Sequence, residues 1–286
     1  MSERRQLINV AYRLLGSLAD AEDVVQETYA RWYALTPAQR DEIESPPAWM
    51  TRVASRICLD LLGSARVRRE RYVGEWLPEP VPDEWNPADP ADPADRITLD
   101  ESVSMAFMVV LESMTSAERV AFILHDVFRY SFAEVAEVVG RTPAACRQLA
   151  SSARRRVRTA PTPAATPPTR ADAIVRGFKQ AWQAGDINAL VALLDPDARA
   201  VADGGGLAEA TPHPIIGAEE IARGMMAILA RTGDMTMVVR TVNGRPGLVL
   251  EQDGVINTVM AFEIDGDRIT HLWAIRNPEK LRPWKG

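Results

Sequence analysis

The chain has 286 residues, 47% of them hydrophobic, which allows two or three folded domains. The formal net charge of −6 argues against a protein coated with basic surface for nucleic acid, but the charge is unevenly placed. Residues 129–158 contain seven Arg and two Glu, whereas residues 71–101 contain two Arg and nine Asp or Glu. A local basic stripe is enough for DNA binding, because it neutralises phosphates whatever the global charge.

Two cysteines, Cys58 and Cys146, lie far apart, and neither has a Cys-x-x-Cys or His neighbour at metal-ligand spacing. This pattern favours buried, reduced thiols in a reducing cytoplasm. Arg4 and Arg5 precede an amphipathic helix and not an apolar run, so a signal peptide is not expected. No apolar stretch approaches the roughly 20 residues that span a bilayer. We therefore expect a cytoplasmic protein that has no membrane association, metal or cofactor and is monomeric when free.

The first 70 residues are predicted to be helical. Apolar residues from Leu7 to Leu15 recur at helical spacing, and Gly16-Ser17 ends that helix. Asp20 is expected to cap the next helix, whose apolar side includes Val24 and Val25. A third helix is predicted to open at Pro46-Pro47 and to run from Ala48 to about Arg69.

Residues 71–98 contain many Pro and Asp residues, which predicts an extended acidic linker. Within the linker, Trp76-Leu77-Pro78 is a small apolar island, and an exposed Trp there would be unusual, so we expect it to dock on another surface. Helices resume near Leu99, and Thr115-Ser116-Ala117-Glu118 is typical of a capped helix start.

Residues 131–158 predict two short helices joined by a tight turn. Gly140 can end the first helix in a left-handed conformation, Thr142 can cap the second, and Pro143 suits its first position. The second helix carries Arg147 and Gln148, followed by further arginines up to Arg158. A helix-turn-helix places such a helix in the DNA major groove. The alternative is an ordinary helical hairpin with a solvated basic end.

A second linker, 159–169, is rich in Pro, Ala and Thr, as a domain boundary should be. Beyond it we expect an α+β domain with a curved antiparallel sheet. The sequence predicts helices and then strands, with turns at Asn243-Gly244, Asp253-Gly254 and Asp265-Gly266. The helices are expected at Ala173–Ala184, Ile187–Leu194 and Ile216–Ala230, and the strands at Met235–Val242, Leu248–Gln252, Val255–Glu263 and Arg268–Ile275.

Three segments, in this order, together resemble a bacterial extracytoplasmic-function sigma factor of RNA polymerase. They are Asp20–Thr28, which is similar to the conserved-region-two signature, Ala48–Arg69, which is similar to the −10 helix, and the helix-turn-helix, which is similar to region four. Trp76–Pro80, Asp203–Gly206 and Asn277–Leu281 are similar to the motifs of a subgroup with a C-terminal SnoaL-like domain of the NTF2-like cone fold. The chain departs from that subgroup at Leu207, where Lys is frequent.

The resemblance implies five parts. These are sigma region 2 at 1–70, a linker at 71–98, region 4 at 99–158, a linker at 159–169 and the SnoaL-like domain at 170–286. Two all-α sigma domains and one α+β domain are therefore expected. The implied partners are promoter DNA and core RNA polymerase, at the clamp helices of its β′ subunit.

For each implied partner, the matching segment contains candidate residues whose side chains could contact it. For the −35 element these are Arg141, Thr142, Ala144, Arg147, Gln148, Arg154 and Arg155. For the −10 element they are Trp49, Arg52, Arg56, Arg66, Arg68 and Arg69. For Trp49 the favoured interpretation is a structural one, in which its ring fixes the helix to the core. For polymerase they are Asp20, Asp23, Gln26, Glu27 and Arg31.

The C-terminal domain is expected to regulate the first two domains in cis. The residues implied in that joint are Trp76, Leu77, Pro78, Asp203, Gly204, Gly205, Gly206, Asn277, Pro278, Lys280 and Leu281. A small-molecule ligand in the cone is a further expectation. Catalysis by Asp203, His213 or His271 is not expected, because no metal-ligand spacing, P-loop or nucleophile motif accompanies them. The alternative function is a one-component helix-turn-helix regulator with a ligand-binding or isomerase-like tail.

Overall fold

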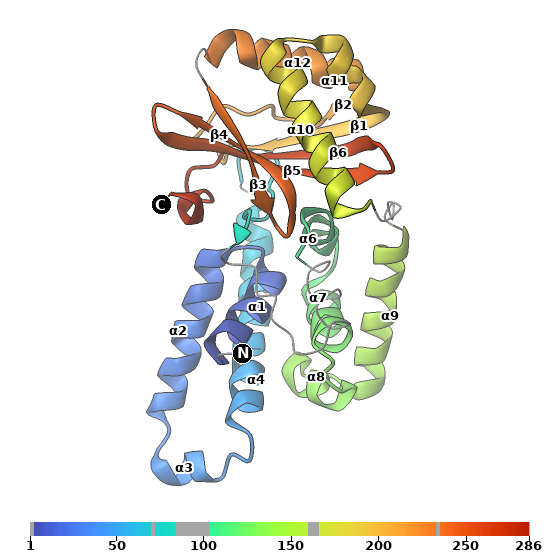
Figure 1. Ribbon diagram of the computed structural model, residues 1–286. Helices are drawn as coiled ribbons and strands as arrows, with labels where there is room; N and C mark the ends of the chain where they lie inside the picture. The colour runs from blue at the N-terminus through green and yellow to red at the C-terminus, as the bar shows by residue number, and fades with distance from the viewer. Residues whose placement is uncertain (1–2, 70–71, 84–102, 160–165, 233–234, 286) are drawn as a thin grey trace. The chain divides into compact units, whose positions relative to one another are not determined.

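The computed structural model describes residues 3–69, 72–83, 103–159, 166–232 and 235–285, with side chains omitted from 65 to 69 (Figure 1). Most of the predicted linker at 71–98 and part of the one at 159–169 lie outside these ranges. The contacts divide the chain into two units. The first contains the helices up to Thr159, with α6 from Phe107 onward. The second contains the segment from Tyr72 to Asp83, the residues Ser104–Ala106 and the described chain from Thr166 onward.

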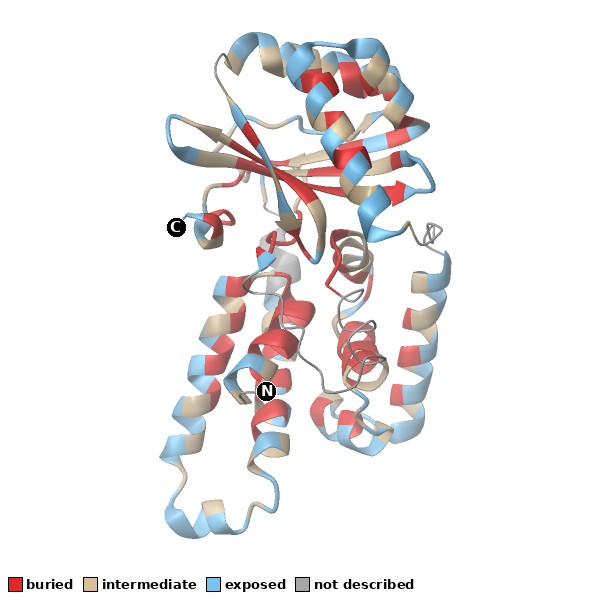
Figure 2. Ribbon diagram, viewed as in Figure 1, coloured by how far each residue is buried: buried red, intermediate tan, exposed pale blue. Residues whose placement is uncertain are grey.

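The first unit is helical, as predicted. Its helices are α1 (Glu3–Leu15), α2 (Leu18–Ala34), α3 (Pro37–Asp41), α4 (Pro46–Arg69), α6 (Met105–Glu112), α7 (Ser116–Phe122), α8 (Phe132–Val139) and α9 (Pro143–Thr159). A π-helical turn at Ile123–Val127 follows α7. Every residue of α1 from Leu7 to Leu15 is buried, and α1 packs against both α2 and α4 (Figure 2). This helix is therefore the centre of the core that α1, α2 and α4 form.

The caps in the first unit follow the sequence, with one correction. Thr115 and Glu118 form the predicted capping box at α7, and Gly140 ends α8 with a φ of 70°. Asp20 is not the cap of α2, because Ser17 accepts the hydrogen bond from the Asp20 backbone N–H and the helix begins at Leu18. Serine and aspartate are comparable caps, so the sequence alone does not choose between two that lie three residues apart.

The second unit has helices on a six-stranded twisted sheet. The elements are α10 (Pro168–Ala184), α11 (Ile187–Leu193), β1 (Leu194–Asp203), β2 (Ile215–Ile216), α12 (Ala218–Thr232), β3 (Thr236–Val242), β4 (Arg245–Gln252), β5 (Val255–Asp265) and β6 (Arg268–Ile275), followed by a 3₁₀ turn at Arg282–Trp284. Figure 1 shows α10, α11 and α12 on one face of the sheet. The core between these layers includes Phe178, Trp182, Met260 and Phe262. This layered arrangement is the α+β domain that the sequence predicted.

The strand order is β2-β1-β6-β5-β4-β3, and two predictions about the sheet were wrong. First, β1 and β2 were not predicted, because Asp195-Pro196 is typical of a turn and Ile216 was expected to begin a helix. The structure accommodates these residues through a register shift between Leu194 and Arg199. Second, the sheet is mixed and not antiparallel, because β1 pairs in parallel with β6. Local hairpin signals cannot reveal a pair between the two ends of a domain. The β3–β4, β4–β5 and β5–β6 hairpins are confirmed.

Candidate functional site

The helix-turn-helix presents its candidate DNA contacts at the start of α9. Thr142 Oγ1 accepts a hydrogen bond from the Ala145 backbone N–H at 3.2 Å, so the predicted cap is formed. Cys146, Ala150 and Ala153 are buried on the inner side of α9. The turn before α9 and the outer side of α9 therefore expose a group of polar and small residues, namely Arg141, Thr142, Ala144, Arg147 and Gln148. The Arg147 guanidinium lies 5.2 Å from the centre of the Phe132 ring, which orients it by a cation–π contact.

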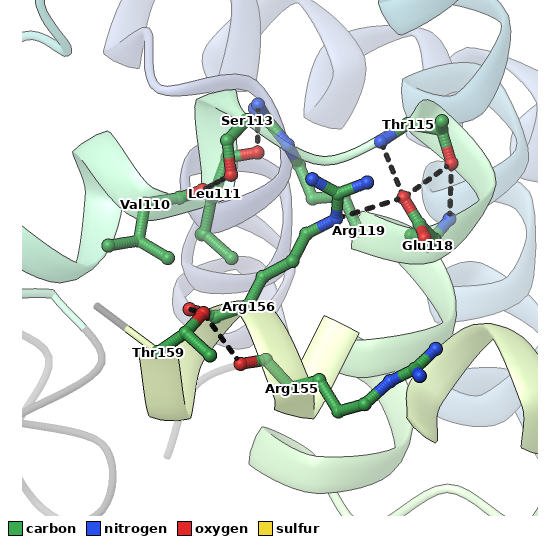
Figure 3. A network of polar contacts seen from close by, with 9 residues as sticks. All are labelled: Val110, Leu111, Ser113, Thr115, Glu118, Arg119, Arg155, Arg156 and Thr159. Carbon is green, nitrogen blue, oxygen red and sulfur yellow. Dashed lines mark hydrogen bonds and ion pairs between the residues drawn. The ribbon is translucent and has the colours of Figure 1, made fainter. Parts of the chain in front are cut away.

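The second half of α9 is braced against its own domain by two of its arginines. Arg154 Nε lies 2.6 Å from Asp126 Oδ1, and Arg156 Nε lies 3.8 Å from Glu118 Oε2. Figure 3 shows Arg156 reaching from α9 to the Thr115–Glu118 capping box. Arg155 and Arg158 are exposed. The predicted basic stripe is thus divided into arginines that hold α9 in place and arginines that face solvent.

Two of the candidate −10 residues on α4 contact the helix-turn-helix itself. Arg52 Nη1 lies 2.7 Å from Glu137 Oε2, and Arg56 Nη1 donates to the Val138 carbonyl at 2.7 Å. Both partners belong to α8. The surface predicted to follow separated DNA strands is therefore occupied by α8 residues in this structure. The side chains of Arg66, Arg68 and Arg69 lie outside the described part of the chain.

Trp49, at the start of α4, packs against α2. Its ring centre lies 5.3 Å from that of Trp32, with the ring planes tilted by 60°. Aromatic pairs of this kind add packing energy beyond the area that they bury. This geometry supports the reading in which Trp49 fixes α4 to its neighbour.

The candidate polymerase-binding face lies along α2. Asp23, Gln26, Glu27 and Arg31 are exposed, and Asp20 is partly buried in the first turn. Glu27 and Arg31 form an ion pair one turn apart, at 2.8 Å. Val24, Val25 and Thr28 are buried on the opposite side, so the polar face of α2 is available to a partner.

A buried arginine that the sequence analysis did not identify joins α1 to α6 and α7. Arg119 Nη1 lies 2.8 Å from Glu112 Oε1 and 3.0 Å from the Leu14 carbonyl, and Nη2 donates to the Leu111 carbonyl at 2.6 Å. Only 2% of its side chain is exposed. Burial lowers the pKa of Arg119 to about 10, so the guanidinium remains charged near neutral pH. We call this contact set the Arg119 joint.

Within the second unit, Asp203 at the end of β1 holds the segment from Tyr72 to Pro82. Asp203 Oδ1 accepts from the Tyr72 hydroxyl at 2.6 Å, and Oδ2 accepts from the Leu77 backbone N–H at 2.8 Å. Lys280 Nζ lies 2.7 Å from Oδ2 and also donates to the Leu77 carbonyl. Asn277 Nδ2 donates to the Tyr72 hydroxyl at 2.7 Å. We call these contacts the linker clamp.

The linker clamp is shielded from water. Asp203 is fully buried, and the Lys280 side chain is 7% exposed and lies 4.1 Å from the Trp76 ring centre. Leu77 and Pro78 are buried as well. Burial, followed by the hydrogen bond to the Asp203 carboxylate, raises the pKa of Tyr72 above its ordinary value. Tyr72 therefore stays protonated and keeps donating to Asp203.

Glycines permit the close approach of the Asp203–Gly206 turn to the linker. A Cβ on Gly205 would lie 2.2 Å from Asn277 Nδ2 and 2.9 Å from the Tyr72 hydroxyl, and the residue has a φ of 62°. Gly204 and Gly206 complete the turn, and Leu207 after them is 62% exposed. Pro278 is partly buried and Leu281 is buried beside the clamp residues. The three motifs named from the sequence thus lie together in one unit.

The clamp extends along the linker through residues that the sequence reading did not include. Asn243 Oδ1 accepts from the Val81 backbone N–H at 3.1 Å, and the Asn243 backbone N–H donates to the Val81 carbonyl at 2.8 Å. Trp284 Nε1 donates to the Pro80 carbonyl at 2.8 Å. The sequence predicted Asn243 only as part of a hairpin turn. No sequence signal indicated its contact with the Val81 backbone.

The three groups considered for catalysis are dispersed. Asp203 is held in the clamp, His213 is exposed, and His271 stacks on Trp273 with ring centres 5.5 Å apart. Burial, then the charge of Arg199, lowers the pKa of His271. Across the described residues, no cluster of three or more His, Cys, Asp or Glu side chains could hold a metal ion. None of the described helices is both long and apolar enough to cross a membrane.

Two family models match the first unit. Sigma-70 region 2 matches residues 1–68, and Sigma-70, region 4 matches residues 104–157.

Relatives match nearly the whole chain. The chain is 38% identical to the ECF RNA polymerase sigma factor SigJ of Mycobacterium tuberculosis H37Rv, over 97% of this chain and 90% of the relative. It is 31% identical to the probable ECF RNA polymerase sigma factor SigI of M. tuberculosis, over 99% of this chain and 93% of the relative. The crystal structure of M. tuberculosis SigJ has a TM-score of 0.77 and 36% identity, covering 99% of this chain and 96% of that chain.

Proposed function

The chain belongs to the extracytoplasmic-function sigma factors, which direct RNA polymerase to specific promoters, and we propose which of its surfaces do this and how they are controlled. The start of α9 reads the −35 element, α4 engages the −10 element, and the polar face of α2 docks on core polymerase. The observation that carries the proposal is the helix-turn-helix with its formed caps and its exposed Arg147. Because the partner is RNA polymerase, we expect the protein to act in the cytoplasm.

Arg147→Ala should weaken recognition of the −35 element selectively. A bidentate arginine–guanine pair discriminates by about 1–3 kcal/mol, or roughly 5- to 150-fold in affinity. In vitro transcription with core polymerase on promoters with an intact and a scrambled −35 element measures this loss. Arg158→Ala is the matched control, because Arg158 is exposed at the other end of α9. A loss of equal size on both promoters would remove Arg147 from base recognition.

The first unit, in the form described, is a closed state. Arg52 and Arg56 are engaged by α8, and the Arg119 joint ties α1 to α6 and α7. Reading the −10 and −35 elements at once requires these contacts to open. We propose that polymerase binding supplies the free energy, since a ligand shifts a conformational equilibrium only by its differential affinity for the two states.

The second unit acts as a restraint on the linker. When extended, residues 72–82 could span roughly 36–40 Å. While the linker clamp holds them, that length is unavailable for separating region 2 from region 4. In this proposal, release of the clamp increases the separation that the two DNA-reading regions can reach, and hence promoter output.

We expect the second unit to bind and not to catalyse. Its buried carboxylate, Asp203, is neutralised by Lys280 and hydrogen-bonded to Tyr72, which leaves it unsuited to general acid or base work. Sigma factors act by binding polymerase and DNA. A one-component regulator with the same tail is disfavoured by the region 2 match, and such a regulator would not require core polymerase to bind its promoter.

A further inference from the structure

A cavity of about 590 Å³ lies in the second unit, between the sheet and α12. Its floor is formed by alternate residues of four strands, namely Ala200 and Ala202, Leu272 and Ala274, Met260, and Leu250. Alternate residues of a strand share a face, and Ala200, Leu250, Met260 and Leu272 lie in the same core cluster as residues of α10 and α12. Three of these six residues are alanines, which leaves the space open. The volume falls within the range of about 300–1,000 Å³ typical of small-molecule sites.

The inner wall is apolar and adaptable. The Trp182 indole N–H donates to the Met225 carbonyl at 2.8 Å, so its ring adds apolar surface. Methionines at 225, 235 and 260 line the cavity, and their flexible thioethers can fit ligands of varied shape. Thr258 donates to Asn257 Oδ1 at 3.0 Å, so this polar pair is satisfied locally. The interior therefore selects an apolar ligand body.

The charged residues of the lining have a net positive charge. Arg231 and Arg276 face a single carboxylate, Glu209. Arg231 Nη1 lies 2.9 Å from Glu209 Oε1, with both side chains more than half exposed, and Arg276 Nη1 donates to the Glu209 carbonyl. A guanidinium carries five N–H donors in a geometry that suits carboxylates and sulfonates, and each of these contacts occupies one of them.

We propose that this cavity is a binding site for a small molecule with an apolar body and one acidic group. The body lies among the alanines and methionines of the sheet and α12, and the acidic group meets Arg231 and Arg276. The described lining contains one carboxylate, Glu209, and it is paired with Arg231.

The cavity adjoins the linker clamp through two chain neighbours, and this step rests on the proposed role of that clamp. Ala202 lines the cavity and Asp203 follows it, while Arg276 lines the cavity and Asn277 follows it. The Arg276 backbone N–H also donates to the Asp203 carbonyl at 2.7 Å. A ligand that displaces the end of β1 or the residues after β6 therefore moves the two side chains that hold Tyr72.

Binding can be tested on the full chain with two dyes of nearly the same body. 8-Anilino-1-naphthalenesulfonate carries an acidic group, and N-phenyl-1-naphthylamine does not. We expect the sulfonate to bind more tightly, and Ala274→Phe or Ala227→Phe to weaken both dyes by about tenfold or more, because a phenyl ring then occupies the cavity. Ala230→Phe on exposed α12 surface is the matched control, and circular dichroism verifies folding.

Arg231→Gln should weaken the sulfonate several-fold and leave the neutral dye unchanged. Arg223→Gln is its control, because Arg223 is also an α12 arginine paired with glutamates but lies outside this cavity. Dye binding that neither cavity-filling variant weakens, or equal loss of both dyes in Arg231→Gln, would overturn the assignment.

Hydrogen exchange over residues 72–82, with and without the sulfonate, tests the coupling. A changed exchange rate in the wild type and not in Ala274→Phe supports it. Unchanged exchange at saturating dye would overturn the coupling. Fast exchange over 72–82 in the dye-free protein would instead contradict the linker clamp, so the two failures are distinguishable.

Discussion

Asp203→Asn should destabilise the second unit by about 3–5 kcal/mol, because it leaves the Lys280 ammonium buried without a counter-charge. The variant also weakens the hold on Tyr72 and Leu77, which both donate to the carboxylate. Hydrogen exchange measured across a urea series, on peptides from β5 and β6, gives the unfolding free energy of this unit alone. Exchange over residues 72–82 should rise with it.

Asp267→Asn is the matched control. Asp267 also pairs with a cation, Arg170 at 2.7 Å, but both side chains are more than half exposed. Solvent screens such a pair, so its loss should have little effect. If Asp203→Asn were no more destabilising than Asp267→Asn, the linker clamp would not be a significant source of stability.

Arg119→Met should destabilise the first unit by about 3–5 kcal/mol. The substitution removes one partner of a buried ion pair and leaves the Leu14 and Leu111 carbonyls without this donor. Because the Leu14 contact crosses from α7 to α1, region 2 and region 4 should also separate more readily. Urea unfolding followed by exchange on α1 and α7 peptides measures the first effect, and a fluorescence distance between labels on α4 and α8 measures the second.

The double variant Arg119→Met/Glu112→Leu separates charge from packing. In Arg119→Met the Glu112 carboxylate is left without its cation, and Glu112→Leu removes that carboxylate. The double variant should therefore recover much of the lost stability. Arg31→Met is the surface control, because its ion pair with Glu27 is half exposed. A double variant as unstable as Arg119→Met would show that the carbonyl contacts, and not the ion pair, hold the joint.

Local chemistry made the candidate DNA-binding surface predictable. Gly140, Thr142 and Pro143 occupy the turn and cap positions that their backbone preferences indicate, and α9 then exposes Arg147 by periodicity alone. These features depend on residues a few positions apart. The sequence predicts the helix end and the cap because the backbone preferences that cause them act within one helical turn.

Long-range contacts were not predictable in the same way. The resemblance named Asp203, Asn277 and Lys280, but Tyr72 as a donor and Asn243 as a linker partner had no local signal. The sequence did not predict the Arg119 joint, because a single arginine near the start of a helix is usually exposed to solvent. The parallel β1–β6 pair joins segments about 70 residues apart, beyond the reach of hairpin patterns.

Leu207 illustrates how a departure from the subgroup pattern is accommodated. Its side chain is exposed after the glycine turn, while the cation that neutralises Asp203 is Lys280. The linker clamp of this chain is therefore complete without a lysine at position 207.

In vitro transcription by full-length Gly205→Ala tests the central claim, that the linker clamp restrains promoter output. A methyl group there meets Asn277 and Tyr72 and should release the linker, so output per polymerase-bound molecule should rise several-fold. Gly266→Ala has the same left-handed strain, with a φ of 59°, but its Cβ meets nothing within 4 Å. Output from Gly205→Ala equal to or below that of Gly266→Ala would contradict the account.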